Sequence, residues 1–121
     1  MKEIFASGLT YRVNGRLWVE TEQDRFLGPG RIELLQKIQE YGSISKAAAA
    51  MQMSYKKAWD LVASMNSQAH HPLVMAQTGG KKGGGALVTE AGQQAIMQYL
   101  ALQERFKAFL AQESQSLYSG I

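Results

Sequence analysis

The segment from Ser43 to Asn66 constrains the fold of this chain most strongly, because it predicts two short helices separated by only a few residues. Ser43 caps the first helix, over about residues 44–51, and Ser54 caps the second, because a serine hydroxyl can accept from the free amides of a helical first turn. Small side chains at Ala47 and Ala48 allow another helix to approach closely. Two short helices joined by a tight turn are typical of a helix-turn-helix.

The N-terminal third predicts a β-hairpin followed by a helix. Leu9–Val13 and Arg16–Glu20 are rich in β-branched and aromatic residues. The Asn14-Gly15 pair between them is the one that a type I′ turn favours. Thr21–Leu27 is polar and is expected to form a loop. Apolar residues at helical spacing then predict a helix over about residues 30–41.

The segment after the helix-turn-helix predicts a second hairpin and a long helix. Strands over residues 73–78 and 86–88, joined by a glycine-rich loop, form a wing over about residues 73–88. Thr89 caps a helix that ends at about residue 113, although Gly92 weakens its first turn. The sequence therefore predicts one domain over residues 1–121 with a mainly α fold and small β elements. This fold is a winged helix-turn-helix with an N-terminal β-hairpin and a long C-terminal helix.

The positive charge of the chain is concentrated in its middle third. Residues 43–89 carry five lysines and a single acidic residue, Asp60, a net charge of +4, whereas residues 1–42 sum to zero and residues 90–121 to −1. This distribution is expected of a surface that meets an acidic polymer. A solvated basic face without a partner is the alternative.

Helical phasing divides the second helix into two faces. At about 100° per residue, a stripe of Ala58, Leu61, Val62 and Met65 faces the core, and the opposite side is free for bases. The candidate DNA-binding residues of the whole chain are Ser43, Ser54, Tyr55, Lys56, Lys57, Trp59, Asp60, Lys81 and Lys82.

These candidates have different expected roles. Ser54 caps the helix and can also contact phosphate, Tyr55 and Lys56 are the candidates for base edges, and Lys57 is expected to bind phosphate. Trp59 either packs against a neighbouring element or contacts DNA. Asp60 either accepts from a cytosine amino group or holds a Lys or Arg side chain in place, and we favour the second use.

The loop Gly79–Gly85 is interpreted as a wing tip whose Lys81 and Lys82 reach an adjacent DNA backbone or minor groove, or as a solvated hairpin end. A nucleotide-binding loop would require Ser or Thr directly after the lysine and a helix after the loop. His70-His71 is a poor chelating pair with no carboxylate cluster nearby. The sequence therefore predicts no enzyme, no cofactor and no metal site.

The composition indicates a cytoplasmic protein. No apolar run approaches the roughly 18 residues that a membrane span needs, and the N-terminal apolar stretch is too short and too interrupted for a signal peptide. The chain has no cysteine, which excludes disulfides and thiolate metal sites.

Two stretches of the sequence resemble a known family. The segment GSISKAAAAMQMSYKKAWDLVASMN and the following TGGKKGGGALVTEAGQQ resemble the N-terminal domain of ModE-type molybdate-responsive transcriptional regulators. The specific parts are SYKxAWD and TGGKxGGGA, and LVTEAG is similar to LysR-type regulators, which share the winged-helix arrangement. The likeness runs from about Ile32 to Leu110.

The resemblance implies a homodimer bound to a palindromic operator, with the long final helix serving the dimer. The candidate interface residues are Ile96, Tyr99, Leu100, Phe106, Phe109 and Leu110. The sequence departs from the family in two ways. The sequence ends before any molybdate-binding domain, so anion sensing is not carried over: we expect that the protein either acts without a ligand or relies on a separate partner to sense the anion. Gln52 also stands where the turn often has glycine.

The leading hypothesis is thus a sequence-specific DNA-binding regulator, with molybdate transport or molybdenum-enzyme genes as its targets. The alternative is a winged-helix module that binds another protein and does not read DNA.

Overall fold

The computed structural model describes residues 1–77 and 84–119, so the predicted contacts Lys81 and Lys82 lie outside the described residues. The described chain divides into two compact units. The larger unit is Trp18–Tyr99, and the smaller one combines Met1–Leu17 with the residues from Leu100 onward. The larger unit holds the helix-turn-helix and the wing.

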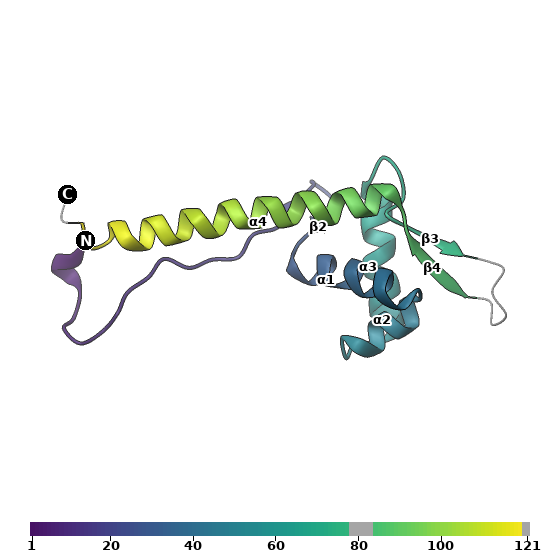
Figure 1. Cartoon of the computed structure of the whole chain (residues 1–121), viewed down its shortest axis with the longest axis horizontal. Coiled ribbons are helices and arrows are strands. Elements are labelled where there is room, and N and C mark those ends of the chain that lie inside the picture. The colour runs from purple at the N-terminus through teal and green to yellow at the C-terminus, as the bar shows by residue number, and fades with distance from the viewer. Residues whose placement is uncertain (78–83, 120–121) are drawn as a thin grey trace. The chain divides into compact units, whose positions relative to one another are not determined.

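The larger unit contains the predicted helices and wing (Figure 1). Its helices are α1 (Pro29–Tyr41), α2 (Ile44–Ala50), α3 (Tyr55–Gln68) and the first part of α4 (Glu90–Ser116). The wing strands β3 (Val74–Gln77) and β4 (Gly85–Val88) pair antiparallel, from Val74 opposite Val88 to Gln77 opposite Gly85. The predicted helices and the wing are confirmed, with element bounds within three residues of those expected. The described residues therefore form a winged helix-turn-helix.

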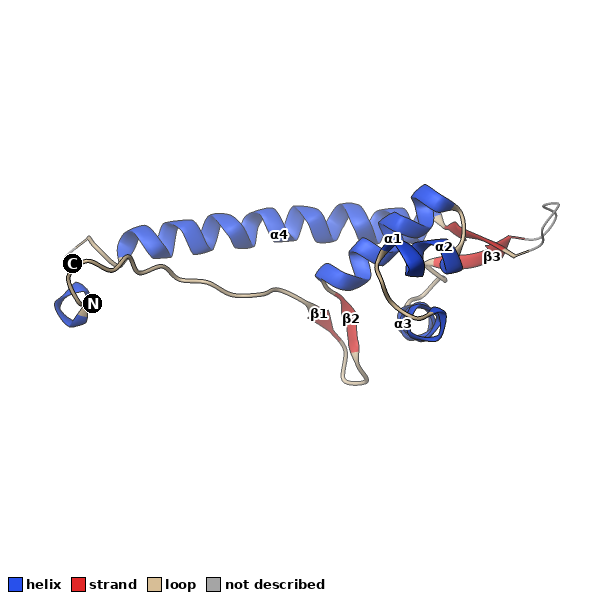
Figure 2. Cartoon of the chain, turned by 90° about the horizontal axis from the view of Figure 1, so that it is seen from below, coloured by secondary structure: helices blue, strands red, loops and turns tan. Residues whose placement is uncertain are grey.

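The N-terminal hairpin is present but is built from other residues than predicted. Strands β1 (Val19–Glu20) and β2 (Arg25–Leu27) pair antiparallel, and they form a sheet separate from the wing (Figure 2). Thr21–Leu27, which was expected to form a loop, therefore supplies both the turn between the two strands and the strand β2. The prediction of strands over Leu9–Val13 and Arg16–Glu20 was wrong, because neither Asn14 nor Gly15 has the positive φ that a type I′ turn requires.

The smaller unit explains why residues 9–17 do not pair as strands. The Tyr11 amide donates to the Tyr118 hydroxyl over 2.7 Å, and the Val13 amide donates to Ser114 Oγ over 2.8 Å. The Phe5 ring stacks on Tyr11 with ring centroids 4.0 Å apart. Side chains from α4 and the residues after it thus satisfy backbone groups that would otherwise need a partner strand.

The core of the larger unit lies where α1, α2 and α3 meet. Ile38 of α1, Ala47 of α2 and Met65 of α3 are each fully buried. The small side chain of Ala47, with Ala48 beside it, brings α2 close to its neighbours, as predicted. This packing fixes the direction of α3, which carries the candidate DNA-binding residues.

The start of α4 depends on a close approach to the wing. Thr89 Oγ1 accepts from the Gly92 amide over 3.1 Å, which confirms the predicted cap. Gly92 is buried, and a Cβ added there would overlap the Leu73 carbonyl oxygen and lie 2.7 Å from Val88 Cγ1. Glycine therefore costs helix propensity at this position but is required by the packing of α4 on the wing.

Candidate nucleic-acid interface

Both helices of the helix-turn-helix begin at the serine caps predicted from the sequence. Ser43 Oγ accepts from the Lys46 amide over 2.9 Å, and Ser54 Oγ accepts from the Lys57 amide over 3.0 Å. Each cap satisfies one of the four amides that a helix start leaves without an internal partner. The Ser54 cap fixes the first turn of α3, which bears Tyr55, Lys56 and Lys57.

The two faces of α3 follow the predicted phasing. Ala58, Val62 and Met65 are buried, and Leu61 is partly buried against the same core. On the other side, Tyr55 is 56% exposed and Trp59 is 52% exposed. We call Tyr55, Lys56, Trp59 and Asp60 the outer face of α3. Since Trp59 is half exposed, its indole has free surface for a partner.

Lys56 and Asp60 form an ion pair on this outer face. Lys56 Nζ lies 3.0 Å from Asp60 Oδ2, one helical turn away. Of the two uses considered for Asp60, holding a lysine side chain is the arrangement present in the structure. Because an exposed pair at this spacing stabilises a helix very little, its main consequence is to set where the Lys56 ammonium lies.

The turn between α2 and α3 contains a strained residue. Gln52 has a φ of 56°, in the left-handed region that glycine adopts without cost. The sequence already has glutamine at this position, where the turn of a helix-turn-helix often has glycine.

Replacing Gln52 by glycine is expected to raise the free energy of unfolding by about 1 kcal/mol, because it relieves the left-handed strain. Chemical denaturation would measure the change. Gln52→Ala is the control, because it removes the side chain but keeps a Cβ, and we expect no gain from it. Equal stabilities of the glycine and alanine variants would contradict this explanation.

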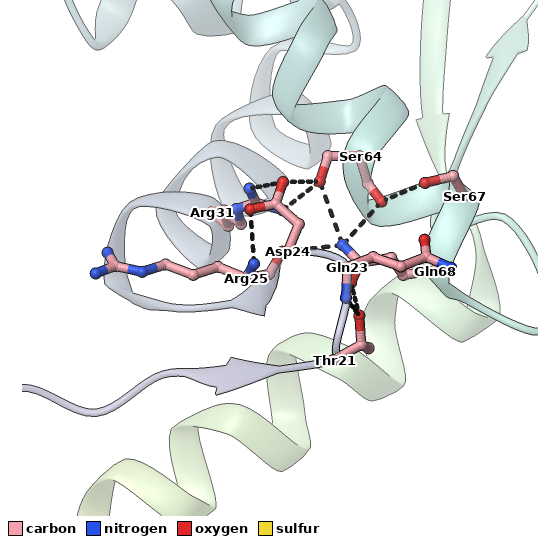
Figure 3. A network of polar contacts seen from close by, with 8 residues as sticks. All are labelled: Thr21, Gln23, Asp24, Arg25, Arg31, Ser64, Ser67 and Gln68. Atoms are coloured by element: carbon pink, nitrogen blue, oxygen red, sulfur yellow. Dashed lines mark hydrogen bonds and ion pairs between the residues drawn. The ribbon is translucent and has the colours of Figure 1, made fainter.

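The C-terminal half of α3 is held by a polar network that joins it to α1 and to the β1–β2 turn (Figure 3). Ser64 Oγ donates to Asp24 Oδ2 over 2.8 Å and accepts from Arg31 Nη1 over 2.9 Å. Arg31 Nη2 lies 3.3 Å from the same Asp24 oxygen. Gln68 Nε2 donates to the Arg25 carbonyl over 2.9 Å, and the Thr21 hydroxyl donates to Gln68 Oε1.

No pattern in the sequence predicts this network. Asp24 and Ser64 are 40 positions apart in the sequence, so no local pattern indicates that they meet. The signal that was present is weak: a polar residue, Ser64, lies on the edge of the buried stripe of a helix.

The hydrogen bond from Ser64 and the bond from the Arg25 amide lower the pKa of Asp24 below its usual value of 3.8. A carboxyl whose pKa is lower in the folded state stabilises the fold above the unfolded pKa, and this contribution is lost as the pH falls through the folded pKa. Asp24→Asn is therefore expected to lower the melting temperature near neutral pH.

The melting-temperature difference between wild type and Asp24→Asn should narrow as the pH is lowered below about 4. Differential scanning calorimetry across this range would test it. Glu22→Gln removes the same charge from the same turn and is the control. Its melting temperature should differ little from that of the wild type at every pH. A difference for Asp24→Asn that is independent of pH would contradict this account.

The base of the wing is fixed to the helix-turn-helix by hydrogen bonds. Asn66 Oδ1 accepts from the Leu73 and Val74 amides over 2.8 and 3.2 Å, and Asn66 Nδ2 donates to the Val74 carbonyl over 2.9 Å. The Ala86 amide donates to the Gly42 carbonyl, which follows α1, over 2.9 Å. These bonds set the start of β3 relative to α3 and the start of β4 relative to α1.

The candidate interface residues of α4 have different environments. Ile96 and Tyr99 are 9% and 2% exposed and belong to the core of the larger unit, so their side chains contribute almost no surface to a partner. Leu100 and Phe109 are 39% and 55% exposed. Phe106 and Leu110 are half-buried.

Neither a metal cluster nor a membrane span is present in the part of the chain that the structure describes. Over residues 1–77 and 84–119, no three His, Cys, Asp or Glu side chains are grouped so as to hold a metal ion. None of the helices in these ranges combines the length and the apolar character needed to cross a membrane.

A capped, half-exposed helix packed on two others and flanked by a two-stranded wing defines a winged helix-turn-helix of the kind that places one helix against nucleic acid. The chain belongs to a family described as bacterial regulatory helix-turn-helix protein, lysR family, whose model matches residues 30–93.

Curated relatives share more of the chain. The molybdenum transport protein ModE of Azotobacter vinelandii is 37% identical over 106 residues, covering 88% of this chain and 39% of the relative. The DNA-binding transcriptional dual regulator ModE of Escherichia coli is 46% identical over 94 residues, covering 77% of this chain and 36% of the relative. This chain thus spans less than two fifths of the length of these relatives.

A solved structure is also similar. The full-length LTTR LysG of Corynebacterium glutamicum matches with a TM-score of 0.49 and 24% sequence identity, covering 71% of this chain and 29% of that one.

Proposed function

We propose that this chain is a transcriptional regulator that binds duplex DNA in a sequence-specific way, with α3 in the major groove. The observation that carries the proposal is the outer face of α3, where Tyr55 and Lys56 lie exposed in the first turn, directly after the Ser54 cap. In helix-turn-helix proteins the first turn of the second helix is the part that contacts base edges.

The charge and the family support the same assignment. The only acidic residue among residues 43–89 is Asp60, which pairs with Lys56, and the matched family consists of bacterial regulators. In this proposal Ser43 and Ser54 orient the two helix starts, and Lys57 contacts phosphate. Trp59 contacts the sugar or base of an adjacent nucleotide. Lys81 and Lys82, known only from the sequence, contact the neighbouring backbone.

We propose genes of molybdate transport or of molybdenum enzymes as the targets, on the basis of the relatives named ModE. We propose that the protein acts in the cytoplasm, with the DNA. We assign no oxyanion-binding role to residues of this chain.

We propose a homodimer that matches a palindromic operator. The support is the exposed apolar surface of α4 at Leu100 and Phe109, which a second copy would cover. Analytical ultracentrifugation should give a dimer for the wild type. Phe109→Glu should shift it toward monomer, whereas Met75→Glu, which changes an equally exposed apolar residue on the wing, should not.

Selection from a pool of randomised DNA duplexes tests DNA reading directly. We expect the wild type to enrich a palindromic sequence and to lose affinity steeply as salt is raised, because Lys contacts to phosphate release counterions. If no sequence is enriched and all duplexes bind equally, sequence-specific regulation is wrong. If the joint alanine variant of Lys56, Lys81 and Lys82 retains DNA as the wild type does, the protein-interaction alternative is favoured.

A further inference from the structure

The Lys56–Asp60 ion pair occupies the part of α3 that lies furthest from the core. Counting about 100° per residue, the two residues lie opposite the buried stripe that contains Ala58, Val62 and Met65. Their side chains are 84% and 53% exposed, and Nζ and Oδ2 are 3.0 Å apart. A groove that receives α3 therefore meets both charged groups.

The position of Asp60 needs a physical reason. A carboxylate at the centre of a surface that approaches phosphates weakens binding by repulsion, and the exposed pair with Lys56 gives little stability in return. No other acidic residue occurs between Ser43 and Thr89. A hydrogen bond in the groove that requires an acceptor on the protein would offset this repulsion. The exposed N4 amino group of cytosine is a donor for such a bond.

We propose that Lys56 and Asp60 together read one G·C base pair in each half-site, an inference that rests on the proposed DNA-binding function. Lys56 donates to O6 and N7 of the guanine, and Asp60 accepts from N4 of the paired cytosine. Asp60 is thus a specificity-determining residue and also positions Lys56.

The geometry of the ion pair matches that base-pair edge. O6 of guanine and N4 of cytosine are hydrogen-bonded to each other, so they are separated by about 2.9 Å, close to the 3.0 Å between Lys56 Nζ and Asp60 Oδ2. The protein presents a donor beside an acceptor, and the edge presents an acceptor beside a donor. At A·T the two acceptors N7 and O4 lie on either side of the N6 amino group, so one ammonium cannot use both together, and the thymine methyl group adjoins O4.

The test compares the duplexes that three versions of the whole 121-residue chain select from the same randomised pool. They are the wild type, Asp60→Ala and the control Glu40→Ala. The control removes a similarly exposed acidic residue from another ion pair, Lys37–Glu40, with 3.5 Å between Nζ and Oε2. We expect Asp60→Ala to lose the G·C preference at one position of each half-site and to keep the others, while Glu40→Ala selects the wild-type sequence.

Binding to defined duplexes gives the magnitude. For the wild type, changing that G·C pair to A·T should weaken binding about 10- to 100-fold, as the loss of a base contact does. For Asp60→Ala the same change should cost less than about threefold. Both variants should melt as the wild type does, because the two side chains removed, Asp60 and Glu40, are each more than half exposed.

The outcomes separate the inference from the function on which it rests. If the wild type enriches a sequence and Asp60→Ala enriches the same one, the inference is wrong and the proposed function stands. If Asp60→Ala binds every duplex more tightly by the same factor, Asp60 acts only by repelling phosphate, and the inference is again wrong. If the wild type enriches no sequence, the proposed function fails and the inference fails with it.

Discussion

Replacing Gly92 by alanine is expected to lower the free energy of unfolding by about 2 kcal/mol, the scale of overpacking in a close-packed contact. The added methyl group would overlap the Leu73 carbonyl oxygen and lie 2.7 Å from Val88 Cγ1. The carbonyl cannot move away easily, because it accepts from the Thr89 amide over 3.0 Å. At a helix position with free space around it, Gly→Ala would instead raise the free energy of unfolding by about 1 kcal/mol. A loss of stability in Gly92→Ala therefore indicates the close contact with the wing.

Gly30→Ala is the matched control for this prediction. Gly30 also lies in a helix, α1, but nothing lies within 4 Å of the position that a Cβ would take there. Urea denaturation should show Gly92→Ala less stable than wild type and Gly30→Ala equal or more stable. A Gly92→Ala variant at least as stable as the wild type would mean that α4 does not start against the wing in this way.

Replacing Asn66 by alanine is expected to cost about 3 kcal/mol, because a single part-buried side chain satisfies three backbone groups of the wing. It accepts from the Leu73 and Val74 amides and donates to the Val74 carbonyl. Without it these groups lose their partner beside the core residues Leu73 and Val74. The variant should also lose hydrogen-exchange protection at these two amides, since the base of β3 is no longer fixed to α3.

Ser67→Ala controls for loss of a polar side chain at the same end of α3. Ser67 Oγ donates to the Ser64 carbonyl one turn earlier, so its removal should cost much less than the Asn66 change. Comparable losses of stability in the two variants would show that the Asn66 bonds do not hold the wing.

The elements that could be predicted from the sequence depend on local chemistry. Ser43 and Ser54 mark the helix starts because a cap acts within one turn. The phase of α3 follows from its own apolar spacing, and the strain at Gln52 follows from its place in the turn.

The elements that could not be predicted depend on contacts far apart in the sequence. Asn14-Gly15 is a strong local turn signal, but Ser114 and Tyr118 take up the amides of Val13 and Tyr11. The Asp24–Ser64 bond joins two segments with no shared pattern.

The apolar stripe of α4 is a further feature that the sequence predicts only in part. Periodicity indicates that a stripe will be covered but does not say by what. Ile96 and Tyr99 are covered by the chain's own core, while Leu100 and Phe109 remain exposed.

The most direct test of the central claim, that the outer face of α3 contacts DNA, is the affinity of Lys56→Ala for the duplex that the wild type selects. Lys37→Ala is its control, because it removes the same charge from an ion pair on α1. We expect Lys56→Ala to weaken binding by about tenfold or more, the cost of one base contact, and Lys37→Ala to change it less than about threefold. Equal affinities of the two variants would contradict the claim.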